Sequence, residues 1–336
     1  MPAAIAERLR LNEARVTEEI YDALRRQVGQ ELRRSGMVVA ISGGVDSALC
    51  AALAAGAMGP SRVLGLSLPE RESDPSSLEL ARAWAGQLGI GFLVDDITPI
   101  LEACGCYSRR DAAARRVVPE YGEGWRCKLV LDNGGLDSDR LSVCYLAVQP
   151  PGGTVSRVRL PAAELREIVA ATNFKQRVRK MIEYHHADRL NYACVGTPNR
   201  LEYDQGFFVK GGDGLADVKP IAHLYKSQVY QLAEHLGVPE AIRGRTPTTD
   251  TYPLAQTQEE FFFALPLKQL DLVLQARNAG RSAAATALEL GYEPDQVERA
   301  YREIGHKRRV TRHLHLPPLL IEPVDEIDAV SGSAIG

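Results

Sequence analysis

The residues 42–47, Ser-Gly-Gly-Val-Asp-Ser, are of types and at a spacing that could bind a phosphate group. They follow the apolar run MVVAI at 37–41 and precede an alanine-rich stretch that is typical of a helix. Glycine lets the backbone turn tightly and approach a ligand. The N–H groups and the positive dipole end of the following helix attract an anion to the same place. This pattern favours an anion-binding site over an ordinary strand-to-helix turn.

The side chains within this turn define the anion further. Ser42 and Ser47 supply hydroxyl donors, which suit phosphate oxygens. Asp46 would be repelled by phosphate unless a divalent cation such as Mg²⁺ lay between them. Because no Gly-Lys-Ser/Thr follows the glycines, the turn is not a Walker motif. It predicts a site for phosphate and Mg²⁺.

The composition of the whole chain limits the class of protein. Its 336 residues are 45% hydrophobic and 25% charged, which is typical of a globular protein with a sizeable core. The net charge of -3 shows no basic excess of the kind that nucleic-acid-binding proteins use. No apolar run is long enough for a membrane span, and the N-terminus lacks a secretory apolar core. We therefore expect a cytoplasmic protein with neither a nucleic acid nor a membrane as its partner.

The elements that must position the turn alternate between strand and helix. Strands are expected at 37–41, 62–69, 89–97 and 189–197, with helices at 48–57, 76–88 and 162–187. This order predicts an α/β fold with a doubly wound parallel sheet and helices on both faces. We also expect an N-terminal helix within 1–35, one large domain at 36–318 with helices at 225–236 and within 259–309, and a flexible tail at 319–336.

An insertion at about 99–161 interrupts this alternation. Its second half contains three β-forming runs, at 127–132, 140–149 and 154–160, separated by turns at 133–135 and 150–153. The insertion leaves the sheet at the carboxyl end of a strand, where ligands of open parallel sheets bind. A lid or substrate wall is one interpretation, and a surface decoration without a catalytic role is the other.

The motifs in order along the chain resemble those of a known family. The Ser-Gly-Gly-x-Asp-Ser turn resembles the PP-loop of the N-type ATP pyrophosphatases, which cleave ATP to AMP and pyrophosphate. The blocks NFKQRVRKM (173–181), 194–242, TPTTD (246–250) and GHKRR (305–309) are similar to those of the ammonia-dependent NAD⁺ synthetase family. This resemblance implies an adenine-nucleotide α-hydrolase-like, Rossmann-like fold and a homodimer. It also implies ATP as co-substrate, Mg²⁺ as cofactor, and the conversion of deamido-NAD⁺ and ammonia to NAD⁺.

The resemblance also implies roles for individual residues. The implied ATP-binding residues are Ser42, Gly43, Gly44, Asp46, Ser47, Thr197, Lys226 and Thr248. The implied substrate-binding residues are Arg177, Lys210, Asp217, His306 and Lys307, and the implied Mg²⁺ ligands are Asp46 and Glu202. The implied catalytic residues are Asp46, Lys226 and Asp213, of which Asp213 is associated with the incoming ammonia.

Departures from the family pattern leave other functions open. Gly211 stands where the family commonly has an aromatic residue, Leu215 replaces a small residue, and the sequence after 246–248 is unusual. A homologue that amidates a different carboxylate is therefore an alternative. We recognise no glutaminase-like domain, so we expect free ammonia or a separate ammonia donor.

Two further alternatives depend on other features. A PP-loop sulfur transferase would need a reactive thiol, for which the only closely spaced pair is Cys104-x-Cys106. The six cysteines show no paired zinc-binding clusters, and we expect ordinary buried thiols. A nucleotide-binding sensor without catalysis is disfavoured because Asp46, Glu202 and Lys226 are all present.

Overall fold

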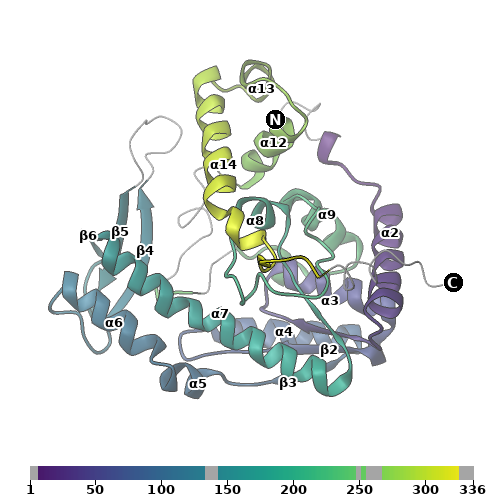
Figure 1. The fold of residues 1–336 in the computed structure, drawn as a ribbon, viewed down its shortest axis with the longest axis horizontal. Helices are drawn as coiled ribbons and strands as arrows, with labels where there is room; N and C mark the ends of the chain where they lie inside the picture. The colour runs from purple at the N-terminus through teal and green to yellow at the C-terminus, as the bar shows by residue number, and fades with distance from the viewer. Residues whose placement is uncertain (1–6, 133–142, 247–250, 255–266, 325–336) are drawn as a thin grey trace.

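A four-stranded parallel sheet forms the centre of the fold (Figure 1). The structure is a computed structural model that describes residues 7–132, 143–246, 251–254 and 267–324. The strand order is β3-β2-β1-β7, made of β1 (Met37–Ala40), β2 (Val63–Ser67), β3 (Gly91–Val94) and β7 (Ala193–Val195). All three strand pairings are parallel, which confirms the predicted sheet.

Helices cover both faces of this sheet. Successive side chains of each strand point to opposite faces, so each strand can contribute to a hydrophobic cluster on either face. Met37 and Val39 of β1 belong to one hydrophobic cluster, whereas Val38 belongs to another. The first cluster includes α2 (Glu13–Arg26), α3 (Val45–Met58), α4 (Pro75–Leu88) and α9 (Lys226–His235). The second includes α5 (Thr98–Ala103), α6 (Cys106–Val117) and α7 (Ala162–Leu190). Burial on both faces explains why the strand sequences are continuously apolar.

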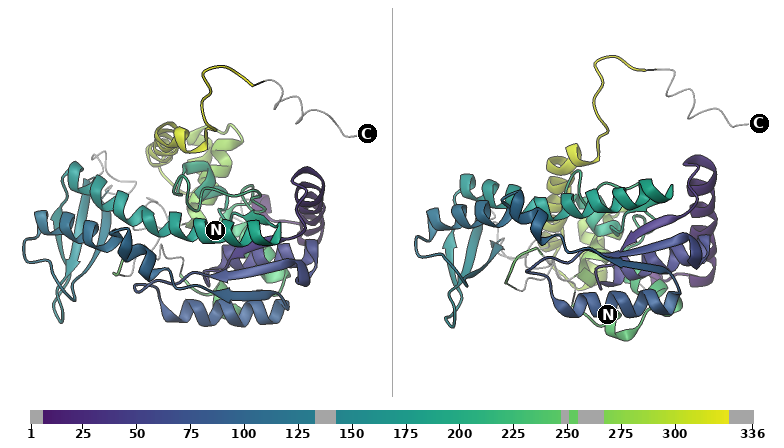
Figure 2. Two further views of the ribbon diagram at one scale, coloured as in Figure 1. Left: turned by 60° about the horizontal axis from the view of Figure 1, so that its bottom comes forward. Right: turned by 90° about the horizontal axis from the view of Figure 1, so that it is seen from below.

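A second, antiparallel sheet lies at one end of the molecule (Figure 2). It contains β4 (Arg126–Asp132), β5 (Val143–Gln149) and β6 (Ser156–Arg159), in that order. These strands match the predicted ribbon, although the turn at 133–135 and the start of the strand at 140–149 lie outside the described residues. The sheet packs on α6 and the first half of α7, and α7 runs from there to the parallel sheet (Figures 1 and 2).

The N-terminal segment differs from the single helix that the sequence predicts. It forms η1 (Glu7–Leu9), α2 and the π-helical η2 (Gln27–Glu31). A new helix begins at Glu13 because the Asn12 side chain accepts a hydrogen bond from the N–H of Arg15 (3.1 Å). The shorter elements η3 (Pro60–Arg62), α8 (Arg200–Gln205) and α10 (Glu240–Arg243) connect the larger ones.

The C-terminal helices pack back on the beginning of the chain. They are α12 (Leu267–Asn278), α13 (Ala283–Leu290) and α14 (Pro294–His315). Leu9 packs against Leu272, and Arg8 pairs with Glu289 at 2.9 Å. Of the tail predicted at 319–336, only the part up to residue 324 lies within the described residues. In the described parts of the chain, no helix combines the length and apolarity needed to cross a lipid bilayer.

Candidate active site

A cavity of about 1080 Å³ lies beyond the carboxyl ends of the parallel strands. Its lining includes 40–47, 66–71 and 195–198, which are the last residues of β1, β2 and β7 and the segments that follow them. The chain proceeds from β1 to β2 and β3 on one side, and β7 is added later on the other side of β1. This is the topological switch point, where open α/β sheets bind their ligands.

The Ser-Gly-Gly turn has the geometry that close approach to an anion requires. Gly43 has a φ of +79°, and an added Cβ would lie 2.8 Å from the carbonyl oxygen of Ser77. The Ser47 hydroxyl donates to the Gly44 carbonyl (3.0 Å) and accepts from the N–H of Ser42 (3.1 Å). Gly44 is the N-cap of α3. Because it has no side chain, it cannot accept hydrogen bonds from the N–H groups of the first turn. These N–H groups therefore suit a phosphate group.

Lys226 and Asp46 form an ion pair at the base of this turn. The other Asp46 oxygen accepts a hydrogen bond from the Asn199 side chain (3.0 Å). Burial alone would lower the pKa of Lys226, but attraction to Asp46 and Glu202 outweighs burial and raises it. Lys226 thus remains a cation in the cavity that it lines.

Asp46 and Glu202 fit a Mg²⁺ site that is completed by a nucleotide. Both line the cavity, and both attract the Lys226 ammonium. Glu202 is held in place by a capping box, in which it accepts from the N–H of Asn199 (3.0 Å). Mg²⁺ is commonly bound by one or two carboxylates together with water and substrate phosphates. The described residues accordingly contain no larger cluster of His, Cys, Asp or Glu able to bind a metal ion.

Asp271, which no local sequence pattern singles out, holds the helix that presents Lys226. Its side chain is fully buried, and its two oxygens accept the N–H groups of Lys226 (3.1 Å) and Ser227 (2.7 Å). It therefore caps the N-terminus of α9 from α12, a distant part of the sequence. Burial raises the pKa of Asp271, although these two N–H donors oppose the shift.

Asp213, Arg177 and Lys210 also line the cavity. Asp213 accepts a hydrogen bond from the N–H of Val209 (2.7 Å), which lowers its pKa, but the dominant effect is burial, which raises it. Arg177 donates to the Lys210 carbonyl (3.3 Å), and the Lys210 ammonium donates to the carbonyl of His313 (2.9 Å) near the end of α14. A lysine at the C-terminus of a helix is favourable because it neutralises the helix dipole.

The remaining predicted site residues have other positions. Thr197 lines the cavity, whereas Asp217, His306 and Lys307 do not. Asp217 accepts from the N–H of Cys194 (2.7 Å) and from the Tyr184 hydroxyl (3.1 Å), and Lys307 pairs with Glu303 (2.7 Å). His306 is exposed, and Thr248 lies outside the described residues.

The cysteines are not placed for sulfur transfer. All six are free, and four of them, including Cys106, are buried. None of them lines the cavity in the described part of the chain. Burial raises the pKa of Cys106 to about 11, which disfavours the reactive thiolate.

The comparisons with known proteins agree with this geometry. The family described as NAD synthase matches residues 16–118 and 147–311. A protein of Rhizobium rhizogenes named NH(3)-dependent NAD(+) synthetase is 53% identical, over 96% of this chain and 97% of its own length. A protein of the same name from Thermotoga maritima is 33% identical, over 83% of this chain and 92% of its own.

A solved NH3-dependent NAD synthetase from Campylobacter jejuni shares the fold. Its TM-score is 0.61 at 19% identity, and the match covers 93% of this chain and all of that one (100%). The family match leaves out residues 119–146, which contain β4 and the beginning of β5. An identity of 53% across nearly the whole length exceeds what a shared fold alone explains. The resemblance seen in the motifs is confirmed, and this chain belongs to the NAD synthase family.

Proposed function

We propose that the protein is an ammonia-dependent NAD⁺ synthetase, which uses ATP to convert deamido-NAD⁺ and ammonia to NAD⁺. The observation that carries this proposal is the convergence of the Ser-Gly-Gly turn, the Asp46–Lys226 pair and Asp213 on one cavity. These groups supply a phosphate site, a cation and a proton acceptor. The similarity to relatives of that name supports deamido-NAD⁺ as the carboxylate substrate.

The first step activates the carboxylate. A carboxylate is a poor acyl donor, so an oxygen of the substrate attacks the α-phosphorus of ATP and forms an acyl-adenylate. The bond between the α-phosphorus and the bridging oxygen to the β-phosphorus breaks, and pyrophosphate leaves with the negative charge. The Lys226 ammonium and the N–H groups at the start of α3 stabilise that charge. Mg²⁺, when bound by Asp46 and Glu202, would neutralise phosphate charge further.

The second step forms the amide. The lone pair of ammonia attacks the acyl carbon, the C–N bond forms, and AMP leaves with the electrons of the C–O bond. The attacking nitrogen must lose a proton, and we propose that the Asp213 carboxylate, which lines the cavity, accepts it. The raised pKa of Asp213 makes it a stronger base than an exposed aspartate.

Further parts of the proposal rest on the family resemblance. We propose a cytoplasmic homodimer that uses free ammonia or ammonia from a separate donor. We also propose substrate-binding roles for Arg177 and Lys210, which their place in the cavity supports. The proposed roles of Thr248 in ATP binding and of Asp217, His306 and Lys307 in substrate binding, and the domain at 36–318, rest on the resemblance alone.

Amidation of a different carboxylate is the second candidate. The fold is also similar to a solved structure named NMN synthetase from Francisella tularensis, with a TM-score of 0.59. That match is only 22% identical and covers 94% of this chain, so it concerns the fold. The segment 119–146 lies outside the family match, but the 53% identical relative matches over 96% of this chain, so this segment does not separate the two candidates.

Product analysis tests both candidates. The protein is incubated with ATP, Mg²⁺, ammonium chloride and deamido-NAD⁺, and the products are identified by mass. The expected products are NAD⁺, AMP and pyrophosphate in equal amounts. Formation of ADP and phosphate would contradict the adenylating mechanism. A pyrophosphate-releasing protein that amidates another carboxylate but not deamido-NAD⁺ would establish the second candidate.

A further inference from the structure

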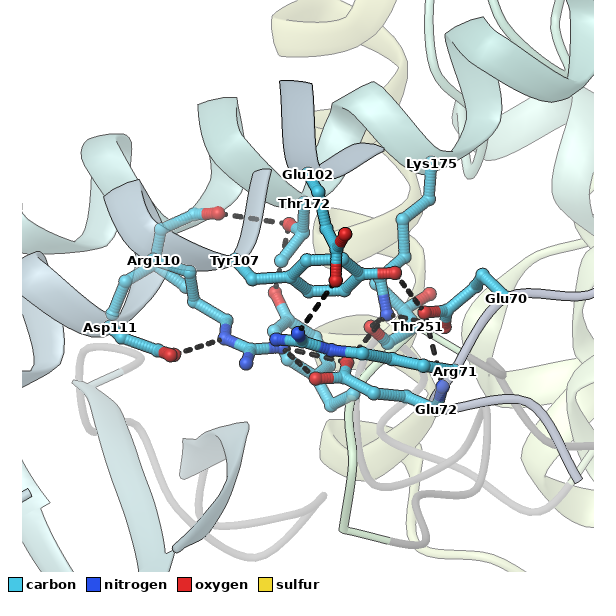
Figure 3. A network of polar contacts seen from close by, with 12 residues as sticks. Glu70, Arg71, Glu72, Glu102, Tyr107, Arg110, Asp111, Thr172, Lys175 and Thr251 are labelled. Atoms are coloured by element: carbon cyan, nitrogen blue, oxygen red, sulfur yellow. Dashed lines mark hydrogen bonds and ion pairs between the residues drawn. The ribbon is translucent and has the colours of Figure 1, made fainter. Parts of the chain in front are cut away.

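A buried network of charged side chains connects α6 and α7 to the segment that follows β2 (Figure 3). At its centre is Lys175 of α7, which is 1% exposed. The Lys175 ammonium contacts Glu70 (2.8 Å), Glu72 (2.7 Å) and the carbonyl oxygen of Thr251 (2.9 Å). One lysine thus joins two segments that are far apart in the sequence.

Two side chains of α6 complete the network. The Tyr107 hydroxyl donates to the second oxygen of Glu70 (2.6 Å). The Arg110 guanidinium donates to Glu72 (2.7 Å) and to Asp111 (2.9 Å), and it is itself almost fully buried. Glu70 and Glu72 are therefore balanced by two buried cations, and the pKa of Glu72 is lowered because Arg110 and Lys175 outweigh the effect of burial.

Both segments that Lys175 joins form part of the cavity surface. The lining includes Glu70 and Arg71 from one segment, and Thr251 and Tyr252 from the other. Lys175 itself is not among the lining residues, so its effect on a ligand is indirect. Buried ion pairs contribute little net stability compared with apolar packing, so a network of this kind is better explained by the position that it gives the wall.

The segment after β2 adjoins the phosphate turn, which makes ATP the ligand it affects. This segment leads into α4, where the carbonyl oxygen of Ser77 would lie 2.8 Å from a Cβ added at Gly43. Arg245 fixes the end of the segment at Asp74 (2.9 Å) and the start of α4 at Ser77 (3.1 Å). Lys175 fixes its beginning, at Glu70 and Glu72.

The second segment links the wall to the antiparallel sheet. Tyr252 is buried in the hydrophobic cluster of that sheet, and the N–H of Leu254 donates to the carbonyl of Cys127 in β4 (3.3 Å). The carbonyl that Lys175 holds belongs to Thr251, the neighbour of Tyr252. The sheet and the charged network therefore hold the same short piece of chain from two sides.

We propose that Lys175 is a positioning residue for ATP, which fixes the wall of the nucleotide site between α6, the segment after β2 and the segment 251–254. The antiparallel sheet then supports the wall of the nucleotide site and is not a surface decoration. This inference rests on the proposed function, because it takes ATP as the ligand.

The test must separate positioning from a loss of folding. Lys175→Met alone leaves two buried carboxylates with one cation and is expected to unfold more easily. The double variant Lys175→Met/Glu70→Gln restores the charge balance, while the contacts of Lys175 to Glu72 and Thr251 remain lost. Tyr107→Phe removes one hydroxyl and no charge. Arg116→Gln is the matched control, since Arg116 forms an exposed α6–α7 pair with Glu164 (3.4 Å) away from the cavity.

Binding of ATP with Mg²⁺ is measured by calorimetry, and thermal unfolding and steady-state kinetics are measured on the same samples. We expect the double variant to unfold within about 4 °C of the wild type. Its Kd and KM for ATP should rise about tenfold with kcat nearly unchanged, as expected when binding of the ground state and the transition state is weakened equally. Tyr107→Phe should show a smaller rise in Kd, and Arg116→Gln none.

Two results would overturn the inference. The first is an ATP affinity equal to that of the wild type in both the double variant and Tyr107→Phe. The second is a fall in kcat with an unchanged KM, which is what a smaller fraction of folded protein produces. If the double variant does not fold, the Kd of Tyr107→Phe decides. Failure of the proposed function is distinguishable, because the wild type itself would then bind no ATP or form no NAD⁺.

Discussion

The ammonium of Lys226, in the first turn of α9, pairs with the carboxylate of Asp46 in the first turn of α3, 180 residues earlier in the chain. The cation is therefore held beside the phosphate turn by the protein itself. Such preorganisation avoids reorganisation when charge develops on the leaving pyrophosphate.

Replacement of Lys226 by Met tests this relationship. We expect the rate of pyrophosphate release to fall by about 10²-fold or more, which is the usual effect of removing a group that stabilises charge in the transition state. Arg243→Gln is the control, because Arg243 forms surface pairs with Glu234 (3.5 Å) and Glu240 (2.9 Å) and does not line the cavity. Pyrophosphate release at the wild-type rate in Lys226→Met would remove this residue from the mechanism.

Asp46→Asn and Glu202→Gln test the metal site. Each keeps the shape of the side chain but removes one negative charge, so turnover at low Mg²⁺ should fall by about 10²-fold. Raising the Mg²⁺ concentration should restore part of the activity, because weaker binding is overcome by mass action. The measurement is turnover as a function of Mg²⁺ concentration. A Mg²⁺ dependence identical to that of the wild type would exclude that residue as a ligand.

The two glycines of the turn should respond differently to alanine. Gly43 has a φ of +79° and no room for a Cβ, so Gly43→Ala should lower the free energy of unfolding by about 1–2 kcal/mol or more. At Gly44, the nearest atom to an added Cβ is the Ser42 hydroxyl oxygen at 3.5 Å, and φ is -95°. Gly44→Ala should therefore fold like the wild type. Chemical denaturation of both variants checks this, and equal destabilisation would contradict it.

Asp213→Asn should separate stability from activity. Burial raises the pKa of Asp213 above its ordinary 3.8, so folding favours the protonated form. The wild type thus loses stability as pH rises from about the ordinary pKa to the folded-state pKa, and the penalty persists above it. The neutral variant lacks this penalty and should be at least as stable at pH 8, with no advantage at pH 3.

The same variant should lose the second chemical step. Without the carboxylate, amide formation should fall by about 10²-fold, the lower range for general base catalysis. Pyrophosphate release in a single turnover should remain close to that of the wild type. A variant that lost both steps equally would show that Asp213 does not act on ammonia alone.

The sequence predicts those features whose signals lie within a few residues. The Ser-Gly-Gly turn contains its own glycines, hydroxyls and carboxylate, and the strands of both sheets show apolar runs bounded by turns. Asp271 and Lys175 have no such local signal. Asp271 is one acidic residue in a helix, and its function appears only when α12 packs against α9.

The role of Lys175 could not be predicted from the local sequence either. Lys175 lies within the motif NFKQRVRKM, two residues before the predicted substrate residue Arg177, but a lysine in a helix is ordinarily solvated. Its burial depends on two glutamates about a hundred positions earlier and on the carbonyl of Thr251. Contacts of that range are set by the packing of α6, α7 and the antiparallel sheet, which no local pattern specifies.

The cap that Asp271 places on α9 also has a consequence for protein synthesis. The ribosome makes Asp46 and Lys226 before it makes Asp271, and a domain generally folds as a unit. A nascent chain that ends before α12 contains the whole phosphate turn, yet the helix that presents Lys226 begins with two uncapped N–H groups. The helix that presents Lys226 to Asp46 therefore reaches its full stability only once α12 has been translated.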